Sequence, residues 1–191
     1  MSMQKLSSEF NNTAVISRQE HAILGTLSDV IIHPKDKKAV GMVLETGRED
    51  IKAVFNASDV VGIGTNFIMI KSADNLSPPD EIIRLKEILD LGIELNGSKV
   101  VDEDGRHLGK IRDWSVDLKT MYLSRLYVVS ASWIKALSQD LIISGDNVIR
   151  IEKGRVIVRG GSVKSEKSAN VVRKRASARV KPAHLAKAKR S

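Results

Sequence analysis

Apolar residues recur at close to every second position in several short segments of this chain. Residues 25–34 (GTLSDVIIHP) and 109–117 (GKIRDWSVD) alternate in this way, which is typical of half-buried β-strands. Each is followed by a segment rich in β-branched and large apolar residues, 39–46 and 123–130. Turn-forming Gly, Asp and Asn residues separate the segments. The pattern predicts a mainly β protein built from small barrels or sandwiches.

One stretch has helical spacing instead, within residues 76–96. Ser77 is placed to cap the first turn, and Gly92 is a typical C-terminal stop. The apolar residues that share one face are Ile82, Leu85 and Leu89. We expect a short amphipathic linker helix that packs on one of the β units, because this apolar area is too large for a free linker.

The chain also repeats itself. LGTLSD (24–29) returns as LGKIRD (108–113) at a shift of 84 residues, and residues 58–70 resemble residues 139–151 at a shift of 81. Two collinear blocks joined by a loop of different length predict a tandem duplication. We assign structural roles to the repeat-equivalent pairs, and we expect Asp29 and Asp113 to cap backbone turns. These pairs are Gly25 and Gly109, Asp29 and Asp113, Asp59 and Asp140, and Gly64 and Gly145.

The predicted organisation therefore has two small barrels in tandem, joined by the helix. Its segments are a flexible N-terminus (1–12), a first barrel (13–75), the linker helix (76–96), a second barrel (97–162) and a disordered basic C-terminal tail (163–191).

Charge is concentrated in that tail. From residue 164 onward there are ten basic residues and one acidic residue, a net charge of +9, whereas the rest carries 21 basic and 22 acidic residues. The tail has no aromatic residue and few large apolar ones, so we expect disorder and electrostatic binding of RNA, the ribosome or DNA. Peripheral contact with an anionic membrane stays open. The residues assigned to this binding are Arg173, Lys174, Arg175, Arg179, Lys181, Lys187, Lys189 and Arg190.

Candidate chemistry is sparse. The chain has no cysteine, and its four histidines are not spaced as metal ligands. VDEDGRH (101–107) lacks the ligand spacing of a calcium loop, so we interpret it as a β-turn. We predict no catalytic residue, no cofactor and no metal, and hence no enzyme. No apolar run is long enough to span a membrane and the N-terminus lacks a secretory signal, so we expect a cytoplasmic protein.

These residues resemble one known family. The Leu-Gly opening, the Asp four residues after that Gly, and the step through SDVVGIG into the strand NFIMI are similar to the PRC-barrel, and the second unit matches more loosely. The resemblance covers about residues 13–72 and 97–158. The family is similar to a domain of the photosynthetic reaction-centre H subunit and to the C-terminal domain of the ribosome maturation factor RimM. Related barrels occur in archaeal cell-division proteins.

In that family the barrel is an interaction module without catalytic residues. The resemblance therefore implies a non-enzymatic adaptor or scaffold whose barrels bind a protein partner of unknown identity. The charge of the tail adds the expected binding of RNA, the ribosome or DNA. The alternative is a cell-division or cytoskeletal scaffold of the archaeal type. In that case the barrels self-associate as a homo-oligomer or bind a division protein.

Overall fold

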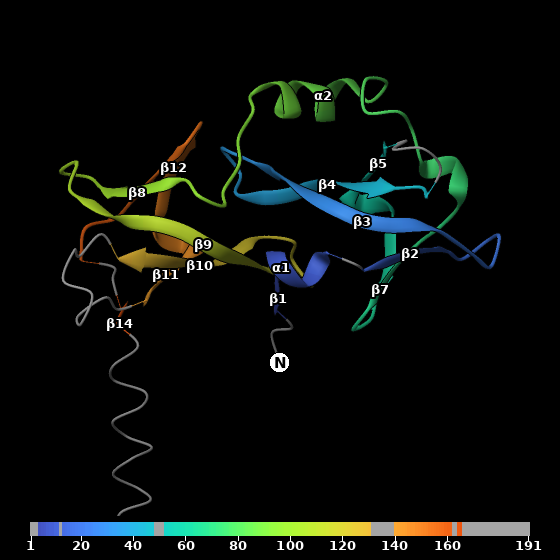
Figure 1. Ribbon diagram of the computed structural model, residues 1–191. Helices are drawn as coiled ribbons and strands as arrows, with labels where there is room; N and C mark the ends of the chain where they lie inside the picture. The colour runs from blue at the N-terminus through green and yellow to red at the C-terminus, as the bar shows by residue number, and fades with distance from the viewer. Residues whose placement is uncertain (1–3, 12, 48–51, 131–139, 162–163, 166–191) are drawn as a thin grey trace, which may run out of the picture.

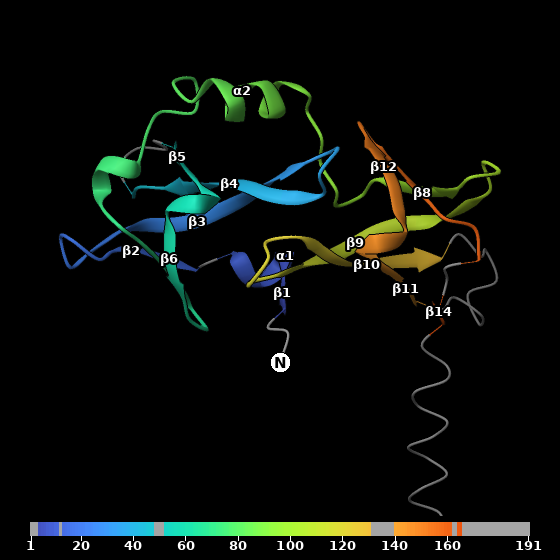
Figure 2. The same ribbon diagram turned by 180° about the vertical axis from the view of Figure 1, so that it is seen from behind.

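A computed structural model of the chain describes residues 4–11, 13–47, 52–130, 140–161 and 164–165. These residues form two β-sheets and a few short helices (Figure 1). The expectation of a mainly β protein is confirmed. The two sheets lie side by side in both views, with the short helix α1 (Ser7–Phe10) between them and α2 (Ile83–Asp90) over the first sheet (Figure 2).

The first sheet has six strands in the order β5-β4-β3-β2-β7-β6. Their bounds are β2 Ala14–Ser17, β3 Ala22–His33, β4 Lys38–Glu45, β5 Lys52–Asn56, β6 Val60–Ile63 and β7 Phe67–Ile70. Strands β2 and β7 are parallel, and the other neighbours are antiparallel.

The second sheet has the order β12-β13-β8-β9-β10-β11-β14, with β1 paired to β9 beside this path. The bounds are β1 Gln4–Leu6, β8 Lys99–Asp102, β9 His107–Asp117, β10 Leu123–Ser130, β11 Asp140–Ser144, β12 Val148–Glu152, β13 Arg155–Val158 and β14 Lys164–Ser165. The parallel pair is β8 with β13, so strands β8 to β13 repeat the order and directions of β2 to β7.

Closed barrels were expected, and within the described residues neither sheet closes. In the first sheet the outer side of β5 is taken by the chain that leads to α2. The Val54 N–H donates to the Ser77 carbonyl at 2.8 Å, and the Ser77 N–H donates to the Val54 carbonyl at 3.0 Å. In the second sheet β14 occupies the corresponding side of β11. At the other ends, β6 and β12 are the edge strands of their sheets among the residues that the structure describes.

The first half of the sequence repeat agrees with the strand register. Asp29 pairs with Val43 in the first sheet and Asp113 pairs with Tyr127 in the second, which preserves the shift of 84 residues. Both hairpins also carry their two register irregularities at equivalent places. The pairs Gly25 with Gly109 and Asp29 with Asp113 are therefore structurally equivalent.

The second half of the predicted repeat disagrees with the strand register and is corrected here. Val60 pairs with Ile70 and Val148 pairs with Val158, so equivalent strands are 88 residues apart here, not 81. The shift of 81 residues places β7 on β12, although β7 corresponds to β13 in the sheets. Successive hairpins share one strand–turn–strand pattern with Gly and Asn in the turn, so an alignment one strand out of step still matches residues. Neither Asp59 with Asp140 nor Gly64 with Gly145 is an equivalent pair.

The N-terminal segment also differs from the expected flexible stretch. Residues 4–6 pair with β9 as β1, and α1 follows directly. The Phe10 side chain is only 2% exposed within the shared core. Burial of this aromatic ring orders a segment whose polar composition suggested a free end.

The helix is shorter than expected and begins later. α2 starts at Ile83 rather than near Ser77, because the Ser77 backbone is paired with Val54. Its expected packing is confirmed, since Leu85 is 2% exposed against Val54 and other residues of the outer face of the first sheet. Gly92, with φ of 59°, ends the helix as expected.

The two sheets meet through the tips of equivalent hairpins. The Ala39 N–H donates to the Met121 carbonyl and the Leu123 N–H donates to the Lys37 carbonyl, both at 2.8 Å. These bonds flank a bridge between Lys38 and Tyr122, so the contact is nearly symmetric. One apolar core contains buried residues from both sheets. The two halves therefore form one packed body.

Candidate functional site

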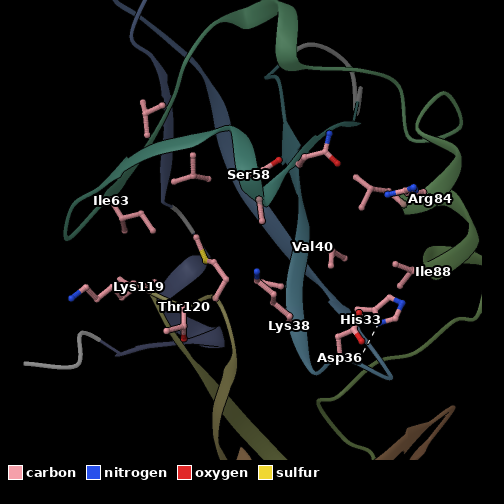
Figure 3. Close-up of a pocket in the computed structure, with 18 of the residues that line it drawn as sticks. His33, Asp36, Lys38, Val40, Ser58, Ile63, Arg84, Ile88, Lys119 and Thr120 are labelled. Carbon is pink, nitrogen blue, oxygen red and sulfur yellow. Dashed lines mark hydrogen bonds and ion pairs between the residues drawn. The ribbon is translucent and has the colours of Figure 1, made fainter.

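A groove of about 1190 Å³ lies between the two halves and α2. One wall is the edge strand β6, and the opposite wall is α2, which contributes Arg84 and Ile88. The β3–β4 hairpin and residues 118–121 of the second half complete it. Segments distant in the sequence thus meet around one open hollow (Figure 3).

Apolar side chains form much of the lining. Val40, Val61, Ile63, Ile88 and Met121 all face this space and are at most partly buried. Val61 of the edge strand β6 is 48% exposed. A partly apolar groove beside an open sheet edge is suited to binding another polypeptide.

The groove carries more cationic than anionic side chains. Lys38 points into the hollow, Arg84 lies on the α2 side, and Lys119 lies at the rim (Figure 3). Of its two carboxylates, Asp36 is bound by His33, with 3.0 Å between Oδ2 and Nδ1, and the other belongs to Glu87. The balance favours an anionic ligand.

The second half shows how an equivalent edge strand is contacted. There the Lys37 ammonium donates to the Val148 carbonyl of β12 at 2.9 Å. Val148 corresponds to Val60 of β6, and Lys37 corresponds to Met121 in the other hairpin tip. The methionine thioether has no hydrogen to donate. The edge of β6 therefore receives no such donor from Met121, although both residues line the groove.

Asp113 lies where the N-terminal segment crosses onto the second sheet. Its carboxylate accepts hydrogen bonds from the Ser7 and Ser8 hydroxyls and from the Trp114 N–H at 2.8 Å. Partial burial raises the pKa of Asp113, but these hydrogen bonds outweigh it and leave the pKa lowered. Asp113 lies within strand β9, so it holds the N-terminal segment on the second sheet and does not cap a turn as expected.

Asp29 occupies the equivalent place with fewer donors. It accepts the Val30 N–H at 2.7 Å and lies beside a smaller hollow of about 370 Å³, which Glu94 also lines. Burial, followed by the nearby Glu94 charge, raises the pKa of Asp29 despite the Val30 hydrogen bond. The same residue type thus has opposite pKa shifts in the two sheets.

The two repeat glycines permit close backbone contact. A Cβ atom on Gly25 would lie 2.3 Å from the Glu45 carbonyl oxygen, and one on Gly109 would lie 2.0 Å from the Val129 carbonyl oxygen. Glu45 and Val129 are themselves equivalent positions. A side chain at either glycine would therefore push apart the strands that pack here.

The remaining assigned residues have separate local roles. Asp59 accepts the Asn56 N–H at 3.3 Å in a short 3-10 turn, and the Gly64 N–H closes the β6–β7 hairpin on Phe67. Asp140 opens β11 by pairing with Val129, whereas Gly145 begins the turn after β11. The structure does not bring these four together.

The turn predicted at residues 101–107 is confirmed. The Asp102 carboxylate accepts the Asp104 and Arg106 N–H groups at 3.0 and 2.9 Å, and the Arg106 guanidinium binds it at 2.7 Å. Burial alone would raise the pKa of Asp102, but these donors lower it.

The residues assigned to nucleic-acid binding lie outside the described part of the chain. They are Arg173, Lys174, Arg175, Arg179, Lys181, Lys187, Lys189 and Arg190.

Comparison with known families finds one match, in the second half. Residues 92–164 match the family model of the PRC-barrel domain. Such a domain indicates a small interaction module. No curated protein matches the chain. The resemblance of the first half to the same family, and that of the chain to RimM, stay predictions.

No helix among the described residues is long and apolar enough to cross a lipid bilayer.

Proposed function

We propose that the protein is a non-enzymatic adaptor. The body formed by the two sheets, read as two copies of one PRC-type unit, binds a protein partner. The tail of residues 163–191 binds RNA, the ribosome or DNA. The observation that carries this proposal is the division of charge, because a tail of net charge +9 follows a remainder with 21 basic and 22 acidic residues.

The tail suits electrostatic binding without sequence reading. Lys and Arg neutralise phosphates and release counterions, so each contact on duplex DNA adds about −0.9 to the salt dependence of binding. No aromatic residue is present from residue 164 onward to stack on bases. Retention on nucleic acid should therefore weaken steeply with salt.

The test is recovery of partners from native lysate at low and raised salt. The full chain is compared with a full-length variant in which the eight assigned tail residues are replaced by Gln, because truncation at residue 163 would remove β14. We expect nucleic acid or ribosomes only with the unaltered tail and only at low salt. We expect a protein partner with both forms.

Nucleic acid that stays with the neutral tail would contradict the electrostatic tether. Recovery of lipid vesicles instead of nucleic acid would move the tail to anionic membranes. The absence of a shared protein partner at both salts would contradict the adaptor role of the sheets.

A self-associating scaffold of the cell-division type is a second candidate. Val61 on β6 and Ile149 on β12 are equivalent positions on the two edge strands, and they are 48% and 44% exposed. Apolar residues on open edges favour pairing between copies. Sedimentation that rises with protein concentration, together with mid-cell location of a tagged protein, would support this candidate over a diffuse adaptor.

A further inference from the structure

We infer that the groove beside β6 binds an extended acidic segment of a partner protein as an added strand. This inference rests on the proposed adaptor function and names the chemistry of its protein partner. Three observations carry it: the open sheet edge, the contact that the other half makes at the equivalent edge, and the charge of the groove.

The first observation is the open edge of strand β6. β6 is the last strand of its sheet, and all four of its residues line the groove. The groove volume of about 1190 Å³ lies above the ~300–1,000 Å³ common for small-molecule sites. A strand edge offers main-chain donors and acceptors at a fixed repeat, which an extended peptide can match.

The second half supplies an internal template. At the equivalent edge, the Val148 carbonyl accepts a hydrogen bond from a residue of the opposite hairpin tip, Lys37. At Val60 the corresponding tip residue is Met121, which cannot donate one. The geometry therefore leaves a place for a donor at β6, and a backbone N–H of an added strand has the required chemistry.

Charge selects the kind of segment. Lys38, Arg84 and Lys119 come from three different segments around the groove, and they outnumber its two carboxylates, Asp36 and Glu87. Side chains of an added strand alternate between two faces. Apolar side chains can then contact Val40, Val61 or Met121, and carboxylates between them can reach the cations. A basic segment would meet repulsion at the same positions.

The experiment measures fluorescence anisotropy of labelled peptides on the full chain. The probes are three peptides of about ten residues in which Val alternates with Asp, Ser or Lys. We expect the Asp peptide to bind about 10-fold more tightly than the Ser peptide, and the Lys peptide not to bind. Equal binding of all three, or no binding of the Asp peptide up to about 1 mM, would overturn the inference.

Equivalent positions in the two halves provide matched controls. Val61→Glu and Lys119→Glu should each weaken binding of the Asp peptide by about 10-fold. Ile149→Glu and Lys35→Glu place the same changes at the corresponding exposed positions, which do not line the groove, and should leave binding unchanged. Circular dichroism confirms that each variant is folded. Equal losses in both sets would overturn the location.

Strand addition is tested separately with an Asp peptide N-methylated at every second residue. Methylation removes N–H donors but keeps the carboxylates, so binding should be lost; unchanged binding would contradict an added strand.

A lysate partner that stays on the Val61→Glu variant would leave the adaptor proposal standing and reject this groove. Concentration-dependent sedimentation abolished by Val61→Glu, without Asp-peptide binding, would assign the edge to a second copy of the chain.

Discussion

Asp29 and Asp113 show how one residue type can have opposite energetic effects at equivalent positions. Both accept the N–H of the following residue, but only Asp113 also receives the Ser7 and Ser8 hydroxyls. The fold therefore favours the carboxylate of Asp113 and disfavours that of Asp29.

This difference predicts opposite effects of Asn substitutions on stability. At pH 7, Asp113→Asn should lower the free energy of unfolding by about 1 kcal/mol, because charge-assisted hydrogen bonds at a partly exposed site are lost. Asp29→Asn should raise the free energy of unfolding, because it removes a carboxylate that burial disfavours. Urea denaturation measures both.

The pH dependence follows from the direction of each pKa shift. As pH falls from 7 toward the ordinary aspartate pKa of about 4, Asp29 takes up a proton in the folded state first, so the gain from Asp29→Asn should disappear. The deficit of Asp113→Asn should persist there, because its lowered pKa keeps the carboxylate charged until the pH falls further. Equal pH dependence of the two variants would contradict these assignments.

At this scale the sequence predicted which aspartates and glycines correspond, but not their environments. Asp113 receives its hydroxyl donors from residues more than 100 positions earlier in the chain. A local pattern contains no information about such a contact. The correct repeat shift after residue 46 could also be found only from the strand register. One hairpin resembles the next in sequence, so the sequence alone does not show which hairpins correspond.

Among the elements, α2 has one buried side chain, that of Leu85. Leu85 packs on the first sheet, and a Cβ atom on Gly41 would lie 2.7 Å from its Cδ1. The second sheet has Arg125 at the position of Gly41, so its outer face does not admit a helix in the same way. The helix thus belongs to the first sheet by shape as well as by apolar area.

We predict that Leu85→Ala lowers the free energy of unfolding by about 2–5 kcal/mol, because it removes a fully buried leucine and leaves a cavity. Ile83→Ala on the same helix is the control. That side chain is 70% exposed, so its loss should change stability by less than about 0.5 kcal/mol. Thermal or urea unfolding compares the two. Equal losses would show that α2 does not depend on this contact.

The apolar stripe and Gly92 predicted the existence, face and end of this helix. Its beginning could not be predicted, because Ser77 has the residue type of an N-cap but forms a bridge to β5. Tertiary pairing overrode a local signal. The groove was not predicted either, since its walls come from four separated segments that share no sequence motif.

At the scale of the whole molecule, the shared core and the paired hairpin tips predict cooperative unfolding. Leu44 in β4 is fully buried in the core that also contains Leu126 of β10. Leu44→Ala should therefore lower the exchange protection of core amides in β4 and β10 equally, by about 2–5 kcal/mol. Hydrogen exchange read by mass spectrometry measures both strands. Unchanged protection in β10 would show that the two sheets unfold independently.

The crossing of residues 7 and 8 onto Asp113 has a consequence for synthesis of the protein. Ser7 must wait for a partner made 106 residues later, which at ~5–20 residues per second means about 5–20 s. During this time the hairpin tip at Lys37–Ala39 also lacks the strand that it pairs with in the finished molecule. The first sheet therefore leaves the ribosome with the tip of its β3–β4 hairpin unpaired. The speed of translation through residues 99–130 sets how long this tip can pair with other chains.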